Sequence, residues 1–155
     1  MNIRLMEISE PKFPYRFKSS KDAFDAVKDY GKADREVFLV LFLNSQNQLI
    51  DCEPVFVGSV GTAAVYPGEV VKSALLRSAT GIICAHNHPS GDCTPSGADI
   101  EITAGIMLAC ESVQIRMLDH IIIGRQSYVS MADNGTITDL EIKVVSAIKS
   151  MGSSL

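Results

Sequence analysis

Two continuous apolar runs constrain the fold of this chain more than any other feature. Residues 36–43 read EVFLVLFL and residues 80–86 read TGIICAH. Each run is too short for a typical helix and is rich in Val, Ile, Leu and Phe. Both are therefore predicted to be strands buried on both faces of a sheet. Such a sheet must be covered by other elements on either side.

The remaining segments alternate between helical and strand patterns. Turn residues NSQNQ predict a hairpin between 36–43 and 49–58. The alternation favours an α/β or α+β fold, with a mixed β-sheet flanked by helices. Besides the hairpin and the strand at 80–86, the predicted helices are 19–31, 67–79, 97–113 and 138–151, and the predicted strands are 115–124 and 126–132.

Two of these helices carry more detailed expectations. In the helix at 97–113, Ile100, Ala104, Met107 and Leu108 are spaced i, i+4, i+7 and i+8, which predicts that this face packs on the core. In the last helix, Thr138 with a glutamate three residues on predicts a capping box at its start.

Composition bounds the class of protein. With 155 residues and 46% hydrophobic residues, the chain suits one domain with a real core. Fourteen basic against 18 acidic residues, a net charge of -4, make a strong phosphate-binding surface improbable without excluding a local patch. Apolar runs are too short to cross a bilayer, so no membrane association is expected. Four scattered cysteines and an N-terminus without a signal-peptide core predict reduced thiols and a cytoplasmic location.

The stretch HNHPSGDCTPSGAD, residues 86–99, holds two of the three histidines. His86 and His88 end a predicted buried strand, and residues i and i+2 of a strand project from one face. Imidazoles at this spacing can share a metal ion, although a His-x-His pair is often only polar surface. Asp99 is the candidate third ligand, carried back by a loop that two prolines stiffen.

A purely structural role is an alternative interpretation of Ser96 and Asp99. Ser96 fits the N-cap of the following helix, and an acid three residues on completes a capping box. A metal-bound Asp99 is expected to have little freedom to reach back to the cap. The text also lacks the His-x-Glu and Pro-Cys-x-x-Cys signature of zinc deaminases.

The spacing of His86, His88, Ser96 and Asp99 resembles the JAMM motif of the JAB/MPN metalloprotease fold. The longer stretch HNHPSGDCTPSGADIEIT resembles the RadC-like branch of that fold. The stretches REVFLVLFLNSQNQLI before it and LDHIIIG after it resemble the same branch. The resemblance runs from about residue 20 to about 132. It implies a JAB/MPN-like mixed sheet with an architecture similar to that of cytidine deaminases. The expected organisation is an irregular lead-in at 1–18, a RadC-like JAB/MPN domain at 19–133 and a C-terminal helical extension at 134–155.

The resemblance also implies a function. His86, His88 and Asp99 would bind one zinc ion, Glu36 would act as general base on water, and Ser96 would stabilise the oxyanion. These roles describe a zinc metallopeptidase acting on peptide or isopeptide bonds of a peptide or protein substrate. The alternative reading of Glu36 is a solvated strand end.

Two other functions stay open at this point. RadC-like proteins carry a DNA-repair label, which would imply action through nucleic acid or a partner, and some relatives of the fold bind no metal. Cys93 stands where the motif usually has proline and is expected to be a partly exposed bystander. His120, in LDHIII, is expected to be structural or to support a ligand rather than to be a fourth ligand. The sequence fixes neither substrate nor oligomeric state.

Overall fold

The structure is a computed structural model that describes residues 16–58 and 65–153. Most of the predicted lead-in, residues 1–15, lies outside the described residues. The described elements, in chain order, are α1 (Ser20–Val27), the 3-10 helix η1 (Lys28–Lys32), β1 (Glu36–Leu43), β2 (Leu49–Gly58), α2 (Pro67–Leu76), β3 (Gly81–Asn87), α3 (Gly97–Ser112), β4 (Arg116–Ile123), β5 (Tyr128–Ser130) and α4 (Thr136–Ser153).

The described strands form one five-stranded mixed sheet in the order β2-β1-β3-β4-β5. β1 pairs antiparallel with β2 and with β3, which confirms the predicted hairpin. β3 and β4 run parallel, joined by the crossover through α3, and β5 returns antiparallel to β4. The central position of β1 and β3 explains why both are continuously apolar: neither strand has a face toward water.

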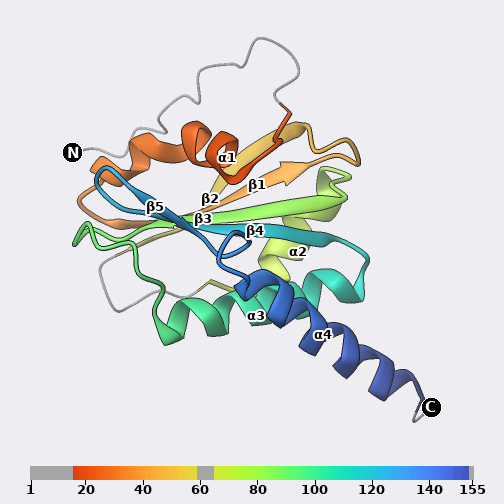
Figure 1. Ribbon diagram of the computed structural model, residues 1–155. Helices are drawn as coiled ribbons and strands as arrows, with labels where there is room; N and C mark the ends of the chain where they lie inside the picture. The colour runs from red at the N-terminus through yellow and green to blue at the C-terminus, as the bar shows by residue number, and fades with distance from the viewer. Residues whose placement is uncertain (1–15, 59–64, 154–155) are drawn as a thin grey trace.

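Helices cover both faces of the sheet (Figure 1). α1 and η1 lie on one face, against the odd-numbered side chains of β1 from Val37 to Leu43. α2, α3 and the first half of α4 lie on the other, against Phe38, Val40 and Phe42. This arrangement confirms the predicted class, a mixed sheet flanked by helices, and is consistent with a JAB/MPN-like fold. All four cysteines are free thiols, as predicted.

The predicted buried face of α3 is confirmed at Met107 and displaced by one residue elsewhere. Ile100 and Leu108 are 38% and 44% exposed, and the buried side chains are those of Asp99, Thr103, Ile106, Met107 and Cys110. A shift of one residue rotates a helix by about 100°. The physical reason is that the helix turns two polar residues, Asp99 and Thr103, toward the histidines, and the apolar pattern alone cannot reveal this.

The predicted start of the last helix is also wrong. α4 begins at Thr136 rather than Thr138, and the side chain of Asn134 accepts the backbone N–H of Thr136 at 3.0 Å. Thr138 is already inside the helix, so it does not cap it. Glu141 instead faces Arg116, with 3.7 Å between carboxylate and guanidinium.

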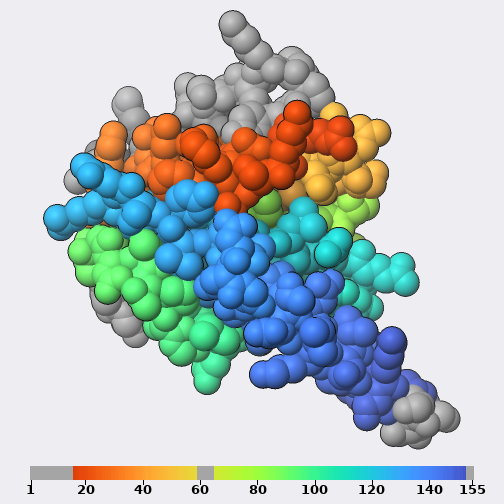
Figure 2. All heavy atoms as spheres, in the orientation of Figure 1, coloured from red at the N-terminus to blue at the C-terminus, as the bar shows by residue number. Residues whose placement is uncertain are grey.

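α4 packs on the body mainly through its first half, and its contacts with the core end at Ile148. Ile137, Leu140 and Val144 are buried against the α3 side of the sheet, whereas Ile142 and Met151 are 63% and 70% exposed. The C-terminal turns project away from the rest of the molecule (Figure 2). Among the described residues, no helix is both long enough and apolar enough to cross a membrane.

We expect α4 to contribute to stability through its first half. Leu140→Ala removes a buried side chain and should lower the free energy of unfolding by about 2 kcal/mol, the low end for a leucine at the margin of a core. Ile142→Ala, on the exposed face of the same helix, should change it by less than about 0.5 kcal/mol. Denaturant unfolding of the two variants checks this, and equal losses would mean that α4 does not dock as described.

Candidate metal centre

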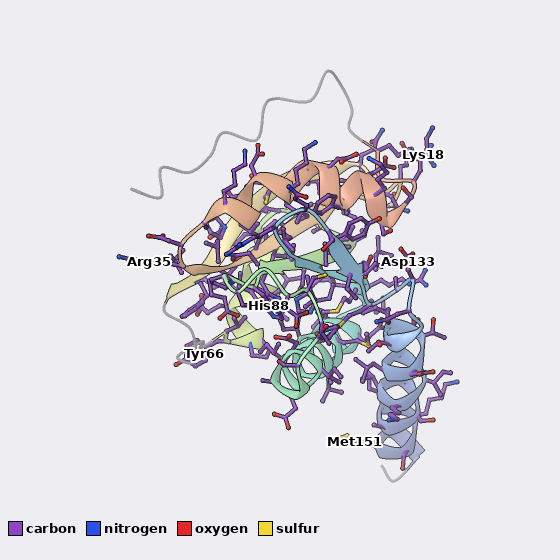
Figure 3. All side chains as sticks on the ribbon, turned by 60° about the vertical axis from the view of Figure 1, so that its left-hand side comes forward. Lys18, Arg35, Tyr66, His88, Asp133 and Met151 are labelled. Carbon is purple, nitrogen blue, oxygen red and sulfur yellow. The ribbon has the colours of Figure 1, made fainter. Side chains whose placement is uncertain are left out.

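The candidate centre lies where β3 ends. His86 is the penultimate residue of β3, and His88 is the first residue after the strand. The backbone N–H of His88 donates to the carbonyl of Ile123 at 3.0 Å, so the parallel pairing with β4 holds the chain in place beyond the strand. The two Nε2 atoms lie 3.0 Å apart, which confirms that both imidazoles project from one face. Figure 3 shows His88 between the sheet and α3.

Asp99, in the first turn of α3, completes the group. Its Oδ1 lies 3.1 Å from Nε2 of His86, and its Oδ2 lies 3.1 Å from Nε2 of His88. A tetrahedral zinc ion with bonds of about 2.0–2.1 Å separates neighbouring ligand atoms by about 3.3–3.4 Å. The observed separations are close to that value, so the three side chains could hold a metal ion.

Asp99 makes both contacts of the capping box and at the same time belongs to the candidate ligand group. The Ser96 hydroxyl accepts the backbone N–H of Asp99 at 3.1 Å, and Asp99 Oδ2 accepts the backbone N–H of Ser96 at 2.8 Å. A carboxylate offers about four lone-pair directions, so one side chain can serve both the cap and a metal. The capping box therefore holds the candidate ligand in place.

The ring of His88 is oriented by the loop that follows it. Its Nδ1 lies 2.7 Å from the backbone carbonyl of Asp92. A carbonyl only accepts, so Nδ1 carries the proton, and in the neutral ring Nε2 keeps its lone pair toward Asp99. The carboxylate of Asp92 instead accepts from the backbone N–H and the hydroxyl of Thr94.

A buried chain of hydrogen bonds orients His86 in the same way. The Thr103 hydroxyl lies 2.6 Å from the carbonyl of Asp99 and 2.6 Å from Nδ1 of His120. Its single proton goes to the carbonyl, so Nδ1 of His120 must be the donor in the second contact. Nε2 of His120 then accepts from Nδ1 of His86 at 2.8 Å. This relay leaves the lone pair of His86 Nε2 directed at the candidate metal position.

The ionisation of the site follows from these contacts. Burial lowers the pKa of His120 well below its ordinary value, which keeps the ring neutral and able to accept from His86. The hydrogen bond with Asp99 raises the pKa of His88. Burial raises the pKa of Asp99, but the Ser96 N–H and, in the metal-free site, protons shared between Asp99 and the Nε2 atoms of His86 and His88 outweigh it and hold the pKa well below its usual range. Asp99 is therefore a carboxylate at neutral pH.

Glu36, at the start of β1, lies beside the centre on the same face of the sheet. Its Oε1 is 3.8 Å from Nε2 of His86, and its side chain is 18% exposed. It is not one of the three side chains whose ligand atoms cluster. Phe38, two residues along β1, stacks on the His86 ring with 5.7 Å between ring centroids and forms an apolar wall behind it.

The other residues singled out from the sequence stay outside the group. Cys93 is half-buried, with Sγ 3.4 Å from the Ser127 hydroxyl, and does not belong to the ligand cluster found among the described residues. Cys84 is fully buried in the core. Sequence reasoning missed Thr103, although its position four residues after Asp99 places both on one helical face.

We expect the relay to tune metal affinity. Thr103→Val keeps the volume but removes the hydroxyl, so Nδ1 of His120 loses its acceptor and the His86 tautomer is no longer fixed. Loss of such supporting contacts typically weakens metal binding by about 10–100-fold. Competition with a chelator of known affinity measures it. Ser112→Ala is the matched control, because Ser112 makes the same i−4 bond on α3, at 2.7 Å to Leu108, without touching a histidine. Equal affinity of both variants would contradict the relay.

Comparison with known proteins places the chain in a family. The model of the RadC-like JAB domain matches residues 17–136. A UPF0758 protein of Haemophilus ducreyi is 51% identical over 100 residues, covering 64% of this chain and 45% of that protein. One from Leptothrix cholodnii is 46% identical over 121 residues, covering 75% and 54%. UPF0758 protein YfjY of Escherichia coli is 46% identical over 122 residues, covering 78% of this chain and 76% of that protein.

The chain spans about half the length of the relatives from Haemophilus ducreyi and Leptothrix cholodnii. With more than half of its residues matched by the family model, this chain belongs to the RadC-like JAB domain family.

Proposed function

We propose that this chain is a zinc-dependent hydrolase of peptide or isopeptide bonds, with Glu36 as its general base. One observation carries the proposal: a partly exposed carboxylate lies 3.8 Å from a ligand nitrogen of the candidate metal group without belonging to that group. A carboxylate that lies next to a metal ion without binding it can exchange a proton with water.

The donor set supports zinc as the metal. Two imidazole nitrogens and one carboxylate oxygen are a common protein contribution to catalytic zinc, which keeps a further position open. When bound, zinc would supply Lewis-acid chemistry, polarising a carbonyl and making water more acidic. His86, His88 and Asp99 would hold it, and the two tautomers fixed at Nδ1 would present bare Nε2 atoms to it.

Glu36 would move the protons of the reaction. It would accept a proton as the water oxygen attacks the carbonyl carbon, and return it to the amine as the C–N bond breaks. The net reaction adds one water across one amide bond, so no oxidant or other co-reactant is needed. The stacking of Phe38 on His86 would exclude water from the sheet side, which strengthens electrostatic interactions at the reacting atoms.

Ser96 would stabilise the developing oxyanion. Its residue is exposed, and its oxygen accepts the backbone N–H of Asp99, so its own proton is available to a ligand. Donors of this kind contribute about 2.7–4 kcal/mol to the transition state in other hydrolases. Because the same hydroxyl caps α3, the helix start fixes the donor beside the candidate metal group.

The first test of the proposal is metal content. Purified full chain, supplied with zinc and dialysed, should hold about one zinc per chain by elemental analysis. Asp99→Asn should weaken binding because it removes the charge, yet keep an oxygen for the Ser96 N–H and so preserve the cap. Far-UV circular dichroism should therefore be unchanged. Wild-type protein that retains no zinc, or an Asp99→Asn variant that binds it as tightly, would contradict the assigned ligands.

The second test concerns Glu36. Glu36→Gln should keep zinc and fold but lose hydrolysis by about 10²–10⁴-fold, because an amide cannot accept the proton. Substrates can be sought in a peptide library that contains main-chain and lysine-linked amide bonds, with products identified by mass spectrometry. Cleavages made by the wild type and absent with the zinc-loaded variant are the signal. A variant as active as the wild type would refute Glu36 as the base.

A further inference from the structure

The residue between the two histidines has contacts that the proposed function does not use. Asn87 is the last residue of β3 and is fully buried. Because strand side chains alternate, it leaves the strand on the face opposite to His86 and His88. A buried amide needs partners for its oxygen and its nitrogen, and both partners of Asn87 lie at the start of β1, one in the strand and one just before it.

The two hydrogen bonds of the Asn87 side chain reach the residues directly before and after Glu36. The Oδ1 of Asn87 accepts the backbone N–H of Val37 at 2.7 Å. Its Nδ2 donates to the backbone carbonyl of Arg35 at 2.9 Å. One side chain therefore binds the main chain on either side of the proposed general base, although the two segments are about 50 residues apart in sequence.

Sheet geometry explains why this side chain is needed. The pairing of β1 with β3 starts at Phe38 opposite His86, so the main chain of Arg35 and Val37 lies beyond the ladder. These two residues turn their polar groups toward β3, while Glu36 turns its own toward Gly58 of β2. The Asn87 amide takes the place of the missing β3 partner and extends the ladder across Glu36.

We propose that Asn87 is a positioning residue for Glu36. By holding the peptide groups before and after Glu36, it fixes the backbone from which the carboxylate reaches to 3.8 Å from His86. The inference rests on the proposed role of Glu36 as general base. Asn87 would then set the register of β1 relative to β3, the strand that carries His86. Misplacement of a catalytic group by about 1 Å can reduce the rate about 100-fold.

A merely structural role would look different. Asn87 also satisfies the buried N–H of Val37, so any substitution should lower stability. If that were its whole role, activity below the melting temperature would be unchanged. A positioning role instead lowers kcat with little change in KM, leaves zinc content unchanged, and disappears when Glu36 is already disabled.

The experiment uses the zinc-loaded full chain and compares Asn87→Leu with the wild type. Asn87→Leu should lower kcat about 100-fold, retain about one zinc per chain, and speed exchange of the Val37 amide about 10-fold or more by NMR. Leu41→Ala is the control for lost stability, because Leu41 is fully buried in β1 but lies away from Glu36. It should lower the melting temperature without changing kcat.

A double-mutant cycle then tests whether Asn87 acts through Glu36. In the Glu36→Gln background, Asn87→Leu should cause almost no further loss of kcat, because the group it positions is already inactive. Independent, multiplicative losses would overturn the proposal, and so would wild-type kcat in folded Asn87→Leu. If the leucine variant does not fold, Asn87→Asp, which keeps the acceptor for Val37 and loses the donor to Arg35, carries the same test.

Failure of the proposed function is recognisable separately. Full activity of Glu36→Gln alone would overturn it, and this inference with it, without any Asn87 variant. Loss of activity in Glu36→Gln together with wild-type kcat in Asn87→Leu would refute the positioning role alone. The exchange rate of the Val37 amide reports the bond to Asn87 directly and depends on no substrate.

Discussion

The convergence of three electron-rich ligand atoms on one point is the constraint that the surrounding structure has to satisfy. Two imidazole nitrogens and a carboxylate oxygen lie within 3.0–3.1 Å of their neighbours at the end of β3. Without a proton or a cation between them, such groups repel one another. Their positions must therefore be imposed by the fold, and each has its own restraint: a carbonyl behind His88, the relay behind His86 and the helix cap behind Asp99.

Several groups in this region serve two purposes at once. Asp99 caps α3 and belongs to the candidate ligand group. Thr103 bonds back to its own helix and orients a histidine on β4. Because both polar residues must face the sheet, they decide which side of α3 is buried, and two large apolar residues, Ile100 and Leu108, are left partly exposed. Here the site sets the orientation of a structural element, at a small cost in buried apolar surface.

Local patterns predicted most of the fold. Unbroken apolar runs identified the two central strands, and turn residues identified the hairpin, because burial on both faces and tight turns each leave a direct mark on the sequence. The candidate ligands were also predictable, since their spacing lies within one strand, loop and helix start. What could not be predicted depended on partners distant in the chain. The rotation of α3 follows from the position of His120, and the role of Asn87 follows from strand pairing with β1; neither leaves a local signal in the sequence.

The chain distances between these residues have a consequence for folding. The candidate ligands span only 14 residues, from His86 to Asp99, so little chain entropy opposes bringing them together. Glu36 reaches them only through antiparallel pairing of β1 with β3, a contact between segments about 50 residues apart whose closure costs more chain entropy. The candidate ligand group and the proposed general base are therefore assembled by contacts of different range, the first within one strand-loop-helix segment and the second by the pairing of two strands. Metal content would report the first of these assemblies, whereas only a measurement on β1, such as protection of the Val37 amide, reports the second.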